Sequence, residues 1–307
     1  MLKPQVLRPG DRVAVVAPAS HFLRDEFEQG IAELRRLGFE PAFDERVFAR
    51  QGYAAGETSL RAGAFREAWE DPTIAAIIAV RGGYGSVHIL PSLSRDLVRR
   101  TPKAFIGYSD LTSLLTYLSV GCGIVCFHGP MLAGTLGRGE GGYDPDTFIR
   151  ALTDTKPLGE LSPPNLEALH KGQAGGPLFG GTLAQIAASL GTPFAFSPPA
   201  GHVLFLEDHN ERPYRLDRML TQLRLAGVLH RASAILFGEF PRCDEPGGEP
   251  TARDALADLV RDFSGPVVFG FPSGHTAGPS MTLPIGVKVR VIADSRSRLI
   301  VEEAGVE

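Results

Sequence analysis

The chain has 307 residues, of which 43% are hydrophobic and 21% charged, and its net charge at pH 7 is −4. This length favours two domains with sizeable cores, and the composition is that of an ordinary soluble globular protein. The charge provides no positive field that would attract nucleic acid or anionic lipid, so neither is expected as a partner. Three cysteines lack metal-ligand spacing, and no apolar signal core or membrane-length run occurs. We therefore expect a cytoplasmic protein.

The first 130 residues alternate short apolar runs with helical patterns. Strands are expected at 13–17, 39–43, 74–80, 104–106 and 124–127. The run at 74–80 is continuously apolar, which is typical of a central strand that is covered on both faces. Strands that alternate with helices imply right-handed crossovers and a parallel sheet. The fold class is therefore α/β, with an N-terminal parallel-sheet domain of the Rossmann-like or flavodoxin-like type.

The segment 136–176 is rich in glycine, proline and charge and has weak periodicity, so it is predicted to connect two domains. The N-terminal domain then covers 1–135 and the C-terminal domain 177–307. The second domain is predicted to be mixed α/β. Its expected elements are buried strands at 203–206, 234–237 and 267–269, helices that start near 182, 213 and 252, and an antiparallel pair at 287–292 and 299–302.

The stretch 104–118 reads as a buried strand, a sharp turn and a helix, with Ser109 and Asp110 in the turn. A hydroxyl on such a turn stands clear of its backbone and lies beside the amides of a helix N-terminus. This is the geometry of a nucleophile elbow, although Leu111 replaces the second glycine of the usual pattern. From the pattern alone, a simple helix cap at Ser109 or Asp110 is the more frequent interpretation.

The loop Arg81–Gly85 follows the buried strand at 74–80, at the end of the sheet where open α/β folds bind ligands. Its adjacent glycines allow backbone N–H groups to approach a substrate and to serve as oxyanion donors. A tight turn without function explains the same residues equally well. Dinucleotide binding is disfavoured, because the first strand is followed by Ala17-Pro18-Ala19-Ser20 and not by glycines.

Glu207 and Asp208 end another apolar strand, where a carboxylate can orient a histidine, although a solvated strand end is the more common explanation. Spacing alone leaves His275, His128 and His209 as candidate bases. The run Cys243-Asp244-Glu245 is interpreted as a surface loop. No zinc signature occurs, so no metal is expected.

Taken together, these stretches resemble the LD-carboxypeptidases, serine peptidases also called muramoyltetrapeptide carboxypeptidases, a family that includes the microcin C immunity peptidases. The resemblance covers nearly the whole chain. It is carried by seven motifs in the family's order: Arg81-Gly82-Gly83-Tyr84-Gly85, Phe105-Ile106-Gly107-Tyr108-Ser109-Asp110, His128-Gly129-Pro130-Met131, Gly180-Gly181-Thr182-Leu183, Leu206-Glu207-Asp208, Tyr214-Arg215-Leu216-Asp217-Arg218-Met219-Leu220 and Gly270-Phe271-Pro272-Ser273-Gly274-His275.

The resemblance implies a cofactor-free Ser-His-Glu hydrolase that removes the terminal D-alanine from cytoplasmic murein tetrapeptide during peptidoglycan recycling. By motif, Ser109 is the nucleophile, His275 the general base and acid, and Glu207 the group that orients the imidazole. The oxyanion donors map to the backbone N–H groups of Gly83 and Asp110. Family members have two domains and often dimerise, so a homodimer is expected.

Three further expectations concern the substrate. Arg81 is a candidate for binding its terminal carboxylate, with a structural ion pair as the rival interpretation. Microcin-type members use an aromatic residue, often tryptophan, on the nucleotide of their substrate, whereas the only tryptophan here is Trp69 in a predicted packing helix. The murein substrate is therefore preferred over a peptidyl-nucleotide. A non-catalytic α/β binding protein is the alternative from a different class.

Overall fold

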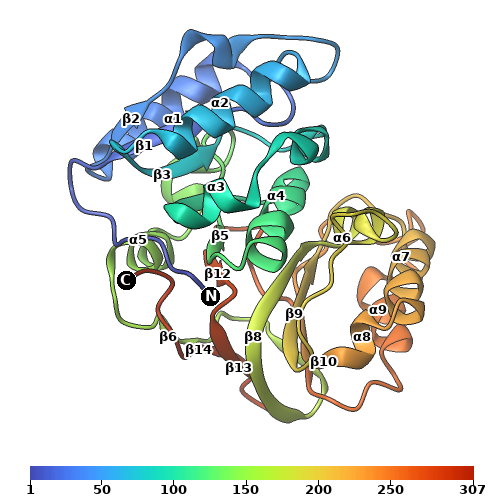
Figure 1. Cartoon of the computed structure of the whole chain (residues 1–307). Coiled ribbons are helices and arrows are strands. Elements are labelled where there is room, and N and C mark those ends of the chain that lie inside the picture. The colour runs from blue at the N-terminus through green and yellow to red at the C-terminus, as the bar shows by residue number, and fades with distance from the viewer.

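Two β-sheets organise the chain in the computed structural model, which describes residues 1–307 (Figure 1). The N-terminal half builds most of one sheet and the C-terminal half builds the other. Buried apolar side chains nevertheless form one continuous cluster that extends through both. The predicted fold class, a parallel-sheet α/β unit followed by a mixed α/β unit, is confirmed.

The first sheet has six strands in the order β12-β5-β4-β3-β1-β2. All neighbours pair in parallel except β12, which runs antiparallel to β5 at the edge. The central strand β3 is almost entirely buried, as its apolar sequence predicts. The strands are β1 (Arg12–Val16), β2 (Glu40–Ala42), β3 (Ile74–Ala79), β4 (Ala104–Gly107), β5 (Cys126–His128) and β12 (Leu283–Ile285).

Helices and short helical segments, the latter labelled η, connect these strands. The helix α2 packs on β1 and β3, and its Phe65 and Trp69 are fully buried. The elements are α1 (Arg24–Arg36), η1 (Glu45–Phe48), α2 (Thr58–Glu70), η2 (Ser86–Ser92), α3 (Arg95–Arg100), η3 (Ser109–Leu111), α4 (Thr112–Thr116), η4 (Tyr117–Gly121), η5 (Leu136–Gly141) and α5 (Pro145–Thr153).

The second sheet has eight strands in the order β6-β14-β13-β8-β9-β10-β11-β7. Its centre, from β8 to β11, is parallel, and both flanks are antiparallel. The strands are β6 (Gly159–Leu161), β7 (Glu167–His170), β8 (Gly172–Thr182), β9 (His202–Glu207), β10 (Ala232–Phe237), β11 (Val267–Phe269), β13 (Lys288–Ala293) and β14 (Arg298–Val301).

Four helices lie together beside the parallel part of this sheet (Figure 1). They are α6 (Leu183–Ser189), α7 (Pro213–Leu225), α8 (Val228–Arg231) and α9 (Ala252–Leu259). The chain reverses after α7 at Gly227, whose φ of 75° is the left-handed conformation expected for a helix C-terminus. The helix starts predicted near residues 182, 213 and 252 are thus confirmed, as is the antiparallel pair β13 and β14.

The segment 136–176 is more regular than its composition suggests. It holds η5, α5, β6, β7 and the first half of β8. The glycines of β8 mark close packing between backbones, because a Cβ on Gly176 or Gly180 would lie 1.9 or 1.8 Å from the carbonyl oxygen of Gly201 or Phe205. The domain boundaries at 135 and 177 stay a prediction.

One expectation about the surface is wrong in part. The run 243–245 was expected to be a surface loop, but Cys243 is fully buried, and its Sγ accepts a hydrogen bond from the Glu211 N–H at 3.4 Å. The apolar thiol turns inward while the neighbouring Asp244 stays exposed.

None of the helices combines the length and the apolar character needed to cross a membrane.

Candidate active site

Ser109 lies directly beyond the C-terminal end of β4, in the turn that leads into η3 and α4. Its φ is 65°, a left-handed conformation that is uncommon for a residue with a side chain. Tyr108 before it is extended, so the backbone reverses sharply at the serine. Such strain persists only where the surroundings impose it, and it is typical of functional turns. The predicted elbow geometry is therefore present, and no side-chain cap by Ser109 is found at η3 or α4.

The loop after β3 packs tightly against this turn through Gly82. A Cβ at Gly82 would lie 2.9 Å from Ser109 Cβ and 3.3 Å from the Asp110 nitrogen. The next residue, Gly83, has a φ of 93°. Neither the Gly83 N–H nor the Asp110 N–H donates a hydrogen bond within the chain, so both are free to bind a ligand oxygen.

Two anchors that the sequence reading missed hold this loop in place. Ser86 donates its backbone N–H to Asp110 Oδ2 at 2.8 Å, and its hydroxyl donates to the Asp110 carbonyl at 2.6 Å. The buried Arg61 of α2 donates to the carbonyl oxygens of Pro18 and Gly85, both at 2.7 Å, and to that of Gly56 at 3.2 Å. An arginine at helical spacing looks like a surface residue in sequence, and only the fold reveals that three backbone segments converge on it.

Glu207 ends β9 in the second sheet and meets His275 in the loop after β11. His275 Nδ1 lies 2.7 Å from Glu207 Oε2, and the His275 backbone N–H donates to the same oxygen at 2.9 Å. Gly274 has a φ of 88° and leaves no room for a side chain, because a Cβ there would lie 2.7 Å from the Glu207 carboxyl carbon. Glycine at 274 thus brings the histidine loop onto the carboxylate, and the two residues predicted as partners are brought together.

The other Glu207 oxygen, Oε1, accepts a hydrogen bond from the hydroxyl of Thr182 at the end of β8. The Thr182 N–H donates in turn to Thr112 Oγ1 at 3.1 Å, and Thr112 begins the helix that follows Ser109. Gly181 makes this contact possible, since a Cβ there would lie 2.7 Å from the Thr112 hydroxyl. A chain of buried polar contacts therefore joins the serine-bearing helix to Glu207 and His275.

The two other candidate histidines lie close by without being equivalent to His275. His128 Nδ1 lies 3.0 Å from Ser273 Oγ, and its Nε2 is 3.9 Å from Glu207 and has no hydrogen-bond partner. Burial lowers the pKa of His128 to about 4, so it is neutral and forms no ion pair. His209 stacks on His275, with ring centroids 3.8 Å apart and planes inclined by 16°.

Burial and the buried carboxylate have opposite effects on the ionisation of this cluster. Burial alone would raise the pKa of Glu207, but the charge and hydrogen bond of His275 outweigh it and lower the pKa to about 2. Burial opposes protonation of His275, yet Glu207 raises its pKa above 6.5. Burial, followed by the charge of Glu207, raises the pKa of Asp208 to about 7. Of His128 and His275, only His275 has a pKa raised by the carboxylate, so it is the imidazole best suited to take up a proton.

Ser109 Oγ forms no hydrogen bond with His275 in this structure. The two residues are linked through Tyr108, whose ring packs in a T-shaped arrangement with the His275 ring at a centroid distance of 5.0 Å. Catalytic hydrogen bonds are often long or poorly aligned before substrate binds. The missing hydrogen bond between Ser109 and His275 is therefore compatible with a nucleophile–base pair. Arg81, the remaining predicted residue, is exposed and forms no ion pair or side-chain hydrogen bond, so the structural ion pair considered for it is not found.

Two family models match the chain. The LD-carboxypeptidase N-terminal domain matches residues 13–129, and the LD-carboxypeptidase C-terminal domain matches residues 175–291. The first model contains the Ser109 turn and the Gly82–Gly83 loop, and the second contains Glu207 and His275. The matched ranges thus coincide with the two halves of the site.

Similar proteins agree over the full length. The chain is 35% identical to a Bacillus subtilis protein named "Probable murein peptide carboxypeptidase", over 99% of this chain and 95% of that protein. It is 31% identical to the murein tetrapeptide carboxypeptidase of Pseudomonas aeruginosa, over 96% and 97%. Among solved structures, the microcin C7 self-immunity protein MccF in complex with glutamyl sulfamoyl guanosine superposes with a TM-score of 0.91 at 25% identity, with both chains fully covered.

Proposed function

The chain belongs to the LD-carboxypeptidase family, and on that premise we propose that it is a serine carboxypeptidase that removes the terminal D-alanine from murein tetrapeptide. The observation that carries this proposal is the 2.7 Å contact between His275 Nδ1 and Glu207, on a ring that packs against the residue before Ser109. The bond cleaved joins the L-centre of a diamino acid to D-alanine.

In the proposed first step, Ser109 Oγ attacks the carbonyl carbon of this bond and its proton passes to His275 Nε2. Glu207 accepts from Nδ1, which fixes the tautomer and stabilises the imidazolium that forms. The negative charge on the substrate oxygen is taken up by the free N–H groups of Gly83 and Asp110. Each such donor is worth about 100- to 1,000-fold in rate.

In the second step, His275 returns the proton to the leaving nitrogen, and D-alanine departs from an acyl-enzyme on Ser109. A water molecule then gives its proton to His275 and attacks the acyl carbon. Collapse of this second tetrahedral state releases the tripeptide and restores the serine hydroxyl. No redox step or cofactor is required, so the chemistry needs only the residues that the two sheets supply.

The alternative within the family is an immunity peptidase that cleaves a peptidyl-nucleotide, which the similarity to MccF supports. Trp69 argues against it here. Its side chain is fully buried in α2, and its indole N–H donates to the Val98 carbonyl at 3.3 Å, so it is not available to stack on a nucleotide. The murein substrate is therefore the preferred proposal.

Two further proposals concern the location and the oligomeric state of the protein. A murein tetrapeptide released for recycling is met in the cytoplasm, so we place the protein there. We also propose a homodimer, as the family resemblance implies, which light scattering on the purified protein would test. We expect neither nucleic acid nor membrane among its partners.

The direct test is mass spectrometry of a synthetic murein tetrapeptide after incubation with the protein. The expected product is the tripeptide, lighter by one D-alanine residue. Parallel incubation with a peptidyl-nucleotide separates the two peptidase functions. An intact tetrapeptide at high enzyme concentration, with the protein folded, would contradict the proposal. If the peptidyl-nucleotide also stayed intact, the non-catalytic binding protein would be the better interpretation.

A further inference from the structure

A polar pocket of about 340 Å³ opens directly beside His275. Its wall combines segments that are distant in the sequence: η5 supplies Arg138, the loop after β10 supplies Arg242, and Tyr108, His209 and His275 complete the side nearest the proposed catalytic groups. Most of the lining side chains carry polar atoms, and none is a carboxylate. The pocket is thus suited to an anionic group.

The two arginines of this pocket make no polar side-chain contact that would stabilise the fold. Neither Arg138 nor Arg242 forms an ion pair or a side-chain hydrogen bond, and both are exposed. Arg242 also holds a φ of 58°, an unfavourable conformation for an arginine. The nearest buried carboxylates are already occupied, Glu207 by His275 and Thr182, and Asp208 by the backbone N–H groups of Ala184 and His209.

We propose that Arg138 and Arg242 bind the terminal carboxylate of the residue that leaves. This inference rests on the proposed function. The leaving nitrogen must lie within reach of His275, because His275 returns the proton to it. The terminal carboxylate is attached to the same Cα as that nitrogen, so it falls on the His275 side of the scissile bond, opposite the oxyanion donors. A guanidinium recognises a carboxylate with two parallel hydrogen bonds.

Arg81 is the rival for this role. It precedes Gly82 and Gly83 in the loop that supplies a proposed oxyanion donor, and it does not line the pocket beside His275. The loop that carries Arg81 packs on the Ser109 turn through Gly82, so a carboxylate held by Arg81 would lie outside the pocket beside His275. The two assignments give the same carboxylate different binding residues and can be separated by mutation.

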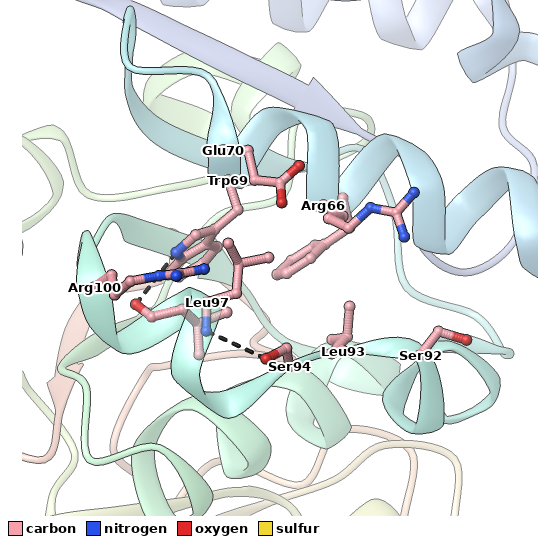
Figure 2. Close-up of a pocket in the computed structure, with 10 residues that line it drawn as sticks. Arg66, Trp69, Glu70, Ser92, Leu93, Ser94, Leu97 and Arg100 are labelled. Carbon is pink, nitrogen blue, oxygen red and sulfur yellow. Dashed lines mark hydrogen bonds between the residues drawn. The ribbon is translucent and has the colours of Figure 1, made fainter.

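A second pocket with two arginines provides a control (Figure 2). It lies between α2 and the segment of η2 and α3, and Figure 2 shows Arg66 and Arg100 at opposite sides of it, with Glu70 close by. None of the proposed catalytic residues lines it. Removing Arg100 therefore changes the charge of the protein by the same amount without touching the pocket beside His275.

The experiment compares kcat/KM for a tetrapeptide ending in D-alanine with kcat/KM for the same peptide ending in D-alaninamide. The variants are Arg138→Gln, Arg242→Asn, Arg81→Lys and the control Arg100→Gln. Asparagine is chosen at 242 because it tolerates a positive φ. A third peptide with lysine in place of the diaminopimelate residue lacks the side-chain carboxylate at that position. Thermal melting checks that each variant folds.

We expect the wild type to prefer the free acid by about 10- to 100-fold, the value of a hydrogen-bonded charge. Arg138→Gln and Arg242→Asn should each lower this ratio and leave kcat/KM for the amide nearly unchanged, while Arg100→Gln and Arg81→Lys keep it. Equal losses on acid and amide, a ratio that falls only in Arg81→Lys, or a loss that is seen with the diaminopimelate peptide and is absent with the lysine peptide would each overturn the inference. A wild type that releases no D-alanine overturns the proposed function itself, and the inference with it.

Discussion

The two halves of the site are positioned by different means. On the first sheet, Ser109 is placed by its backbone, through a left-handed φ and the close approach of Gly82. On the second sheet, the close approach of Gly274 brings the loop of His275 onto Glu207, and buried side-chain hydrogen bonds then hold the pair. The serine half therefore depends on space and backbone conformation, and the acid–base half depends in addition on charge and burial. Substitutions near Ser109 should therefore change the geometry of the site and leave its pH profile unchanged, whereas substitutions at Glu207 should shift the pH profile.

The largest effect is expected for Ser109→Ala, which removes the proposed nucleophile. Turnover should fall about a million-fold, as for a serine removed from a catalytic triad elsewhere. Steady-state release of D-alanine measures this. Ser109→Gly should be as inactive but more stable in urea by roughly 1 kcal/mol, because glycine adopts a φ of 65° without strain. Retained activity in either variant would remove the enzyme mechanism proposed here.

Glu207→Gln tests the electrostatic half. The amide keeps the shape of the carboxylate but cannot stabilise the imidazolium, and we expect a loss of about ten-thousand-fold in kcat. In the proposed mechanism the neutral His275 is the base, so the wild-type rate should fall as pH drops through the His275 pKa, which Glu207 raises. Without that charge, the acidic limb of kcat/KM should move to lower pH.

Asp208 is the control for this pH profile, because burial raises its pKa to about 7 and its own titration could produce a limb there. Asp208→Asn should retain the acidic limb and move it to lower pH by less than Glu207→Gln does, because the Asp208 charge is a smaller cause of the raised His275 pKa than Glu207. A limb that disappears in Asp208→Asn and persists in Glu207→Gln would contradict the assignment.

Gly82→Ala tests the steric half without changing any charge. The new Cβ would lie 2.9 Å from Ser109 Cβ, and the loop or the serine must move. A displacement of this size is expected to cost about a hundred-fold in kcat/KM, with the acidic limb of the pH profile unchanged. Gly247→Ala, where a Cβ meets open space, is the matched control. A shifted pH limb in Gly82→Ala would show that the two halves are not independent.

The smallest effect is expected for Thr182→Val, which keeps the side-chain shape and loses the hydroxyl that binds Glu207. The Thr182 N–H still donates to Thr112, so the contact between the sheets is retained. One neutral-to-charged hydrogen bond predicts a loss of about tenfold in kcat with little change in KM. Thr221→Val, on the exposed face of α7, should change neither.

Much of this arrangement could be predicted from the sequence. The apolar runs located the buried strands, and the strand–turn–helix pattern at 104–118 located the elbow. The resemblance by motif chose His275 among three histidines, a choice that spacing alone left open. The structure places that ring, and no other histidine, within hydrogen-bond reach of Glu207.

Other features depend on contacts between segments that are far apart in the chain. The glycines of β8 suggested a loop, whereas they allow neighbouring backbones to approach. Nothing in the local sequence of Arg61 or Thr182 indicates burial, because each becomes buried only when the other segments fold around it. His209 next to Asp208 reads as a polar strand end, yet it lies flat on His275.

The strand β12 joins the two halves more firmly than their separate family models suggest. It comes from residues 283–285 but completes the first sheet, where it pairs with β5. A fragment that ends at residue 135 would keep Ser109 yet expose the backbone donors and acceptors of β5 to other chains. Expression of that half alone should therefore give aggregates.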